Sequence, residues 1–133
     1  MEGNMNDYLF PYERLQTWQD ARALVKSVYE LTGTFPGTEK FGLVSQLNRA
    51  AVSVASNLAE GTSRTSMKDQ GHFSQLAFSS LMEVACQLTL ASDLGYLTQS
   101  DLSNIKDDIS TLANKINALR NSQLRRAKDK LNR

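Results

Sequence analysis

Apolar residues recur every three or four positions along most of this chain, which is the spacing of one face of an α-helix. The clearest case lies in the last third of the sequence, where the steps of 3, 4, 3, 4 and 3 residues form a heptad seam typical of coiled-coil packing. The seam consists of Leu102, Ile105, Ile109, Leu112, Ile116 and Leu119. Because Gln123 and Arg126 occupy the next two positions, we expect the helix to lose its core face there.

The same spacing predicts three earlier helices. The first covers about residues 13–32 and stops at Gly33, and the second is capped by Thr38 and ended by Gly61 as the glycine after its last turn. The third runs from about residue 66 to residue 94. The apolar positions of the first helix are Leu15, Trp18, Ala21, Val25, Val28 and Tyr29. The expected core lines of the second and third helices are Leu43, Leu47, Ala50, Val54 and Leu58, then Phe73, Leu76, Ala77, Leu81, Val84, Leu88 and Ala91.

Two capping signals mark where the third and fourth helices begin. Ser66 is followed three residues later by Asp69, and Thr98 is followed three residues later by Asp101. A hydroxyl at the N-cap with an acidic residue at the third helical position satisfies backbone N–H groups that the helix leaves unpaired. Gly95 is placed to end the third helix.

Together these signals predict an all-α protein. No stretch alternates apolar and polar residues for long enough to form a strand, and short connections favour antiparallel neighbours. We therefore expect an antiparallel up-down-up-down four-helix bundle. One domain is expected over residues 1–133, with a loose leader over residues 1–11 and a basic C-terminal arm over residues 121–133.

The second helix also carries a narrow polar stripe. Its members, spaced 3, 4, 4 and 3 residues apart, are Gln46, Arg49, Ser53, Asn57 and Glu60. Arg49 and Glu60 are too far apart on one helix to pair, so Arg49 needs a carboxylate from elsewhere, and Glu83 on the third helix is the first choice. The stripe is then either a structural polar network that fixes the register of helices or subunits, or a small polar pocket for a ligand or partner.

The first two helices carry more apolar residues than one core line needs. Those off the main seam are Trp18, Tyr29, Val44, Val52 and Ala55. A second apolar strip predicts an interface, and the many small residues of the second helix favour close approach to another helix or subunit. We therefore expect a homo-oligomer.

The formal net charge of +1 hides an asymmetry. From residue 115 onward one acidic residue faces seven basic ones and the net charge is +6, whereas the remainder carries −5. The basic residues are Lys115, Arg120, Arg125, Arg126, Lys128, Lys130 and Arg133. They suit a helix C-terminus by opposing its dipole, and they also suit a phosphate-binding tail. Arg64 and Lys68, in the loop before the third helix, are further candidates for phosphate contact.

Residues that could carry catalysis are scarce. His72 is the single histidine and is expected to be exposed, and Cys86 is the single cysteine and is expected to be a small buried residue. The sequence has no Glu-x-x-His metal motif, phosphate-binding loop or nucleophile elbow. We expect neither an enzyme nor a bound cofactor or metal. The lone cysteine, the acidic N-terminus and the lack of a membrane-spanning apolar stretch predict a cytoplasmic protein that does not enter the membrane.

These residues resemble a known family, the small bacterial four-helix-bundle proteins first noticed as reading frames in intervening sequences of 23S ribosomal RNA genes. The resemblance covers about residues 12–120 and is strongest over the run GLVSQLNRAAVSVASNLAEG at residues 42–61. The other motifs are Tyr12-x-x-Leu15-x-x-Trp18-Gln19-x-Ala21, Phe35-Pro36, Phe73, Ala77, Ser80-Leu81-x-Glu83 and Leu94-Gly95-Tyr96-Leu97.

The resemblance implies a left-handed bundle and a ring-shaped homopentamer. A related branch of the family acts with diversity-generating retroelements and binds nucleic acid and a reverse transcriptase; that branch tends to be strongly basic. Two hypotheses follow for this chain. It is either a non-enzymatic protein that binds structured RNA or DNA through the basic arm, or an interaction scaffold that docks a partner protein on an oligomeric ring.

Overall fold

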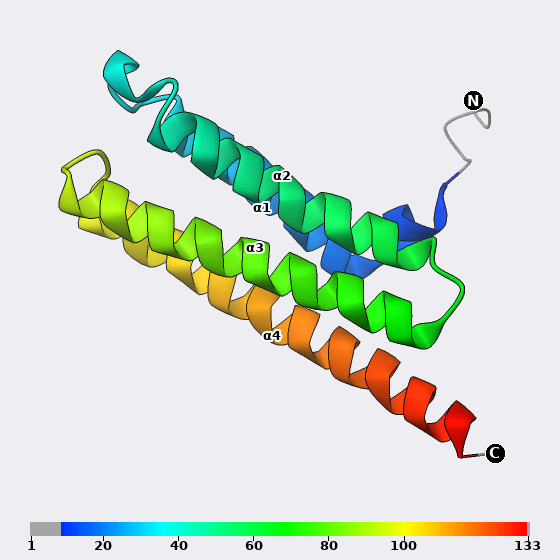
Figure 1. Ribbon diagram of the computed structural model, residues 1–133. Coiled ribbons are helices and arrows are strands. Elements are labelled where there is room, and N and C mark those ends of the chain that lie inside the picture. The colour runs from blue at the N-terminus through cyan, green and yellow to red at the C-terminus, as the bar shows by residue number, and fades with distance from the viewer. Residues whose placement is uncertain (1–8, 133) are drawn as a thin grey trace, which may run out of the picture.

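The computed structural model describes residues 9–132, and this part of the chain is built from helices without a strand. The α-helices are α1 (Gln16–Thr32), α2 (Leu43–Thr62), α3 (Met67–Asp93) and α4 (Gln99–Leu131). Two short 3-10 turns, η2 (Pro11–Arg14) and η3 (Gly37–Glu39), precede α1 and α2. Figure 1 shows four long helices lying side by side, with α1 packed on α2 and α4, and α3 packed on α2 and α4. The predicted all-α four-helix bundle is confirmed.

Cross-helix contacts give the register of the bundle. Along α2 and α3, Gln46 pairs with Gln87 and Ser53 pairs with Ser80, so one helix ascends as the other descends. Along α3 and α4, Ser74 pairs with Gln123. Figure 1 shows that α4 continues beyond the first turn of α3 and ends as a projecting helix. The end of α4 therefore has little cover from α3.

The core contains most of the predicted apolar lines. All five residues of the fourth-helix seam from Leu102 to Ile116 are buried, together with Leu47, Val54, Leu81 and Leu88. Two side-chain predictions are wrong: Leu76 is exposed, and Cys86 lies on the exposed side of α3 instead of in the core. In α1, Leu24 and Thr17 are also buried, although the sequence analysis did not single them out, and Trp18 packs against the core from a partly buried position.

The ends of α3 and α4 follow the sequence signals. The backbone N–H of Asp69 donates to Ser66 Oγ, and that of Asp101 donates to Thr98 Oγ1, both at 3.0 Å. α3 ends at Asp93, and Gly95 follows with a φ of +81°, a conformation that glycine adopts without a steric penalty. Both predicted caps and this glycine stop are confirmed.

The predicted ends of α2 are wrong. Residues 37–39 form the turn η3 instead of the first turn of α2, which begins at Leu43 with Gly42 as its N-cap. Glu39 still acts at this helix start, because its Oε1 accepts the Leu43 N–H at 3.1 Å. Gly61 lies inside α2 and is buried. A Cβ at this position would lie 3.2 Å from the Cβ of Phe73, so a larger residue here would require Phe73 and α3 to shift slightly.

The core face of α4 continues past the predicted stop. Gln123 is only 8% exposed, and the Ser74 hydroxyl donates to its Oε1 at 2.6 Å. One residue on, Leu124 packs over Gly71, where a Cβ would lie 2.6 Å from Leu124 Cδ2. The expectation that the face is lost at Gln123 is therefore wrong, because a buried hydrogen bond replaces an apolar contact there. The uncovered part of the arm begins at Arg125.

At the other end of the chain, residues 1–8 of the predicted leader lie outside the described residues. The segment that follows is structured, since Pro11 begins η2 and the Tyr12 ring packs edge-on against Trp18 at 4.8 Å between centroids. Within residues 9–132, no helix is both long and apolar enough to cross a membrane.

Candidate nucleic-acid interface

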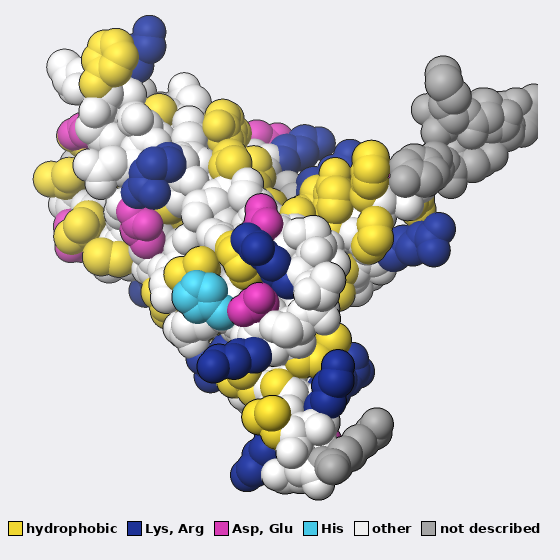
Figure 2. Space-filling view, turned by 45° about the vertical axis from the view of Figure 1, so that its right-hand side comes forward, with side chains coloured by type: hydrophobic (Ala, Val, Ile, Leu, Met, Phe, Trp, Pro, Cys, Tyr) yellow, Lys and Arg dark blue, Asp and Glu magenta, His cyan; other side chains and the backbone are white. Residues whose placement is uncertain are grey.

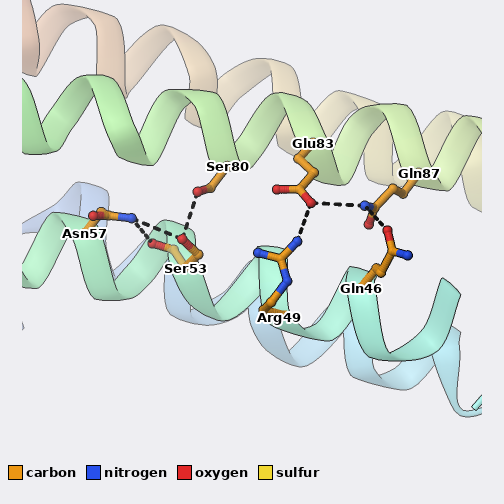
Figure 3. A network of polar contacts seen from close by, with 7 residues as sticks. All are labelled: Gln46, Arg49, Ser53, Asn57, Ser80, Glu83 and Gln87. Carbon is orange, nitrogen blue, oxygen red and sulfur yellow. Dashed lines mark hydrogen bonds and ion pairs between the residues drawn. The ribbon is translucent and has the colours of Figure 1, made fainter. Parts of the chain in front are cut away.

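Two sets of polar residues were candidates for function, and the first is the stripe along α2. Three of its residues, Gln46, Arg49 and Ser53, bond to α3, in two separate groups (Figure 3). Gln87 Nε2 donates to Gln46 Oε1 at 3.2 Å and to Glu83 Oε2 at 3.1 Å, and Arg49 Nη2 donates to the same Glu83 oxygen. The predicted contact between Arg49 and Glu83 is present.

The second group lies two turns along α2 from Gln46. The Ser53 and Ser80 hydroxyls are 2.8 Å apart, and Asn57 Nδ2 donates to the Ser53 carbonyl and hydroxyl at 2.9 and 3.1 Å. Glu60 does not join this network. Its carboxylate pairs with Arg64 at 3.1 Å, one turn further along the chain.

The residues of these two groups bond to one another across α2 and α3. Arg49 and Glu83 are partly solvated, with side chains 61% and 35% exposed, so their ion pair lies at the surface. Gln87 Oε1 is the one buried side-chain oxygen of the seam without a partner among the described residues. Gln87 and Ser80 were missed from the sequence, although Gln87 follows Glu83 by one helical turn, which was a usable signal.

The second set is basic, and several of its members are already engaged within the chain. Lys115 Nζ lies 2.5 Å from Asp20 Oδ2 of α1, and Arg120 Nη1 donates to Gln75 Oε1 of α3. Arg64 pairs with Glu60, and its guanidinium lies 4.6 Å from the centre of the Phe73 ring. These three side chains contribute to packing between neighbouring elements, so they are less available to an external anion.

The remaining basic candidates are exposed at one end of the molecule. Arg125, Arg126, Lys128 and Lys130 lie on the projecting part of α4, and Arg133 lies outside the described residues. Lys68 is exposed in the first turn of α3, one turn before Gly71, which packs on Leu124. Figure 2 shows Lys and Arg side chains gathered over the lower end, where α4 finishes. Within residues 9–132, none of these five exposed side chains has an ion pair or hydrogen bond to another residue of the chain.

The end of α4 is therefore a positively charged helix with little cover from its own bundle. Its basic side chains also lie near the negative, carbonyl end of the helix dipole, which is a favourable place for positive charge. Long, mobile cationic side chains on an exposed helix suit contacts with phosphate oxygens, which require charge more than a fixed geometry.

The other reactive side chains are dispersed. His72 is exposed beside Phe73, and Cys86 is exposed on the outward face of α3. Within the described residues, no three His, Cys, Asp or Glu side chains are grouped closely enough to hold a metal ion.

Comparisons with known proteins identify a matching family and a solved structure of the same fold. The sequence model of the family described as 23S rRNA-intervening sequence protein matches residues 13–118. A solved structure from Bacteroides thetaiotaomicron, described as a protein with unknown function from the S23 ribosomal protein family, superposes with a TM-score of 0.72. The two chains are 17% identical, and the match covers 77% of this chain and 96% of the other, so it supports the fold. No curated protein matches this chain.

Proposed function

Because this chain belongs to the family of 23S rRNA-intervening sequence proteins, and because its exposed basic charge is concentrated at one end, we propose that it is a non-enzymatic homo-oligomer that binds structured RNA. The end of α4 contacts the phosphate backbone, and Lys68 contributes from the adjoining turn of α3. Phosphate contacts carry no sequence information, so the proposed preference is for nucleic-acid shape and charge instead of a base sequence.

The observation that supports this proposal is the contrast among the basic residues. Arg64, Lys115 and Arg120 bond to other residues of the chain. In contrast, the four basic residues of the segment 125–130 are exposed, and Asp129 is the one acidic residue in that segment. Among the described residues these four side chains make no ion pair or hydrogen bond within the bundle, so they are free to neutralise phosphates and to release their counterions.

Self-association strengthens this mode of binding. One arm with four exposed basic residues supplies a modest attraction, whereas several arms on one oligomer act together and raise the overall affinity by multivalency. We propose a homopentameric ring, as the family resemblance implies. The ring would present its arms to one continuous nucleic acid.

A fluorescence-anisotropy titration with a structured RNA hairpin tests this function. The wild-type chain is expected to bind at low salt and to weaken steeply as salt rises, by an amount that reports the number of phosphates neutralised. The double variant Arg125→Glu, Arg126→Glu is expected to lose at least tenfold in affinity and to show a smaller salt slope, since each lost phosphate contact lowers the slope by about one.

The matched control reverses two exposed lysines of the body, Lys26→Glu and Lys106→Glu, and makes the same change in net charge. This control should bind RNA within a few-fold of wild type. No complex at low salt, or an equal loss for arm and body variants, would contradict the proposal. If RNA never binds and the Arg125→Glu, Arg126→Glu variant still captures a protein partner, the scaffold hypothesis is favoured.

A further inference from the structure

The end of α4 carries its exposed basic side chains on two separate sides of the helix. Successive residues of an α-helix are turned by about 100°, so Arg125 and Lys128 lie about 60° apart and form a first basic pair. Arg126 and Lys130 lie about 40° apart and form a second basic pair. The centres of the two pairs are about 150° apart around the helix axis. No single side of the helix therefore presents all four charges.

The second basic pair continues the side of α4 that faces α1, and that side is uncovered there. Arg126 lies about three turns beyond Lys115 and on the same side of α4 to within about 20°, and Lys115 pairs with Asp20 of α1. The two helices run antiparallel (Figure 1), and α1 begins at Gln16, about one turn before Asp20. Cover by α1 therefore stops about one turn past Lys115. Among the described elements, η2 packs on α1 and α2 and not on α4.

On the side of α3, the arm is anchored at its base and then leaves the bundle. Gln123 is held by its buried hydrogen bond to Ser74, and the exposed fraction then rises from 43% at Leu124 to 86% at Leu131. The helix continues unbroken to Leu131, so residues 125–131 extend roughly 10 Å along the axis. Figure 2 shows Lys and Arg side chains on both the left and the right of the lower end of the molecule. The arm is thus a fixed, projecting helix with charge on two sides.

This distribution of charge selects the shape of nucleic acid that satisfies it. A single phosphate strand along one side of the arm would neutralise one basic pair and leave the other in solvent. Two strands that border a groove neutralise both pairs when the helix lies between them. A helix with its side chains is about 10–12 Å across, and the deep, narrow major groove of regular A-form RNA does not admit it. Unpaired nucleotides in a bulge or internal loop interrupt the A-form geometry and open this groove.

From this geometry we infer that the end of α4 enters the major groove of an RNA stem widened by a bulge or internal loop, with one basic pair on each phosphate strand. The inference rests on the proposed function and specifies the class of RNA. The other residues of the arm suit this position. Asp129 lies between the two pairs on one face, about 70° and 80° from their centres, so its carboxylate is kept away from both strands. Ala127 and Leu131 lie between the pairs on the opposite face.

Fluorescence anisotropy on the full-length chain tests the inference with two RNA hairpins that differ only in a bulge in the stem. The wild type is expected to bind the bulged hairpin about tenfold more tightly, since the groove of the continuous stem would have to be opened at a cost. Two double variants, Arg125→Ala, Lys128→Ala and Arg126→Ala, Lys130→Ala, each remove one basic pair. Each is expected to lower the salt slope by about two and to lose most of the preference for the bulge.

Lys26→Ala, Lys106→Ala removes two exposed charges outside the arm and is the matched control, which should keep the preference for the bulge. Circular dichroism of all variants checks that the helices are intact. Equal affinity for the two hairpins, or a loss of affinity with only one of the two basic pairs, overturns the inference while RNA binding stands. A wild-type chain that binds neither hairpin at low salt overturns the proposed function as well.

Hydroxyl-radical footprinting of the bulged hairpin locates the arm on the RNA. Because the two basic pairs contact different strands, the backbone is expected to be protected on both strands that border the major groove beside the bulge. The Arg126→Ala, Lys130→Ala variant should lose protection on one of them. Protection of a single strand by the wild-type chain would overturn the inference.

Discussion

The α2–α3 seam and the end of α4 are both rich in polar side chains, but they differ in where their partners lie. In the seam, Arg49, Glu83 and Gln87 bond to one another across two helices of the same chain. At the end of α4, Arg125 and its basic neighbours have no such partners within the described residues. Polar groups that satisfy one another hold the bundle in register, whereas unpaired charges on an exposed helix are available to a ligand.

The largest effect on stability is expected at the buried hydrogen bond between Ser74 of α3 and Gln123 of α4. Ser74→Ala leaves Gln123 Oε1 buried without its 2.6 Å donor, and an unsatisfied buried acceptor costs about 1–3 kcal/mol of unfolding free energy. Chemical denaturation followed by circular dichroism measures this loss. The double variant Ser74→Ala, Gln123→Leu should recover most of it, because an apolar pair removes the unmet hydrogen bond and extends the heptad seam.

The arm supplies the comparison for that experiment. Arg125→Ala should change the unfolding free energy by less than about 0.5 kcal/mol, since an exposed side chain without a partner stabilises little. If Arg125→Ala lowers the unfolding free energy as much as Ser74→Ala does, the arm is part of the packed bundle. The distinction between the two regions would then fail.

A smaller effect is expected for the ion pair of the seam. Arg49 and Glu83 are partly solvated, so Arg49→Ala should cost roughly 0.2–1 kcal/mol of unfolding free energy, and high salt should reduce that cost. A double-mutant cycle with Glu83→Ala isolates the pair. RNA affinity should be unchanged by Arg49→Ala even though it removes a positive charge. A tenfold loss of RNA binding would show instead that the polar stripe contributes to the interface.

The sequence predicted the elements better than it predicted how they meet. The heptad seam of α4 and the caps at Ser66 and Thr98 are local patterns, and the structure contains them. The burial of Gln123 depends on Ser74, which is 49 residues away, so a polar residue at a heptad position looked like the end of the core. Distant pairings of this kind are set by tertiary packing and leave little local signal.

The candidate sites show the same division. The Arg49–Glu83 contact was accessible because helical spacing left Arg49 without a local partner. An apolar groove between α1 and α2 was only half visible: Val52 and Ala55 stood out as surplus apolar positions, but Pro11 of η2, which closes one end of the groove, was assigned to a loose leader.

The smallest effect on stability is expected at the end of the bundle opposite the arm. There Glu39 links the α1–α2 connection to the α3–α4 connection. The Tyr96 hydroxyl donates to Glu39 Oε2 at 2.9 Å, while Glu39 Oε1 accepts the Leu43 N–H. The hydrogen bond to Glu39, with some desolvation and the nearby negative charge, raises the pKa of Tyr96 above its ordinary value of 10.0. The folded state thus favours the protonated phenol.

This linkage gives the pH dependence a definite sign. Below pH 10 both folded and unfolded Tyr96 are protonated, so the contact contributes its full stability there. As the pH rises through the raised pKa of the folded state, that contribution is lost, because the unfolded chain releases its proton more readily. Tyr96→Phe should therefore be slightly less stable than wild type at pH 8, and the difference should shrink above pH 10. Denaturation curves at both pH values measure it, and a difference that grows with pH would contradict the assigned hydrogen bond.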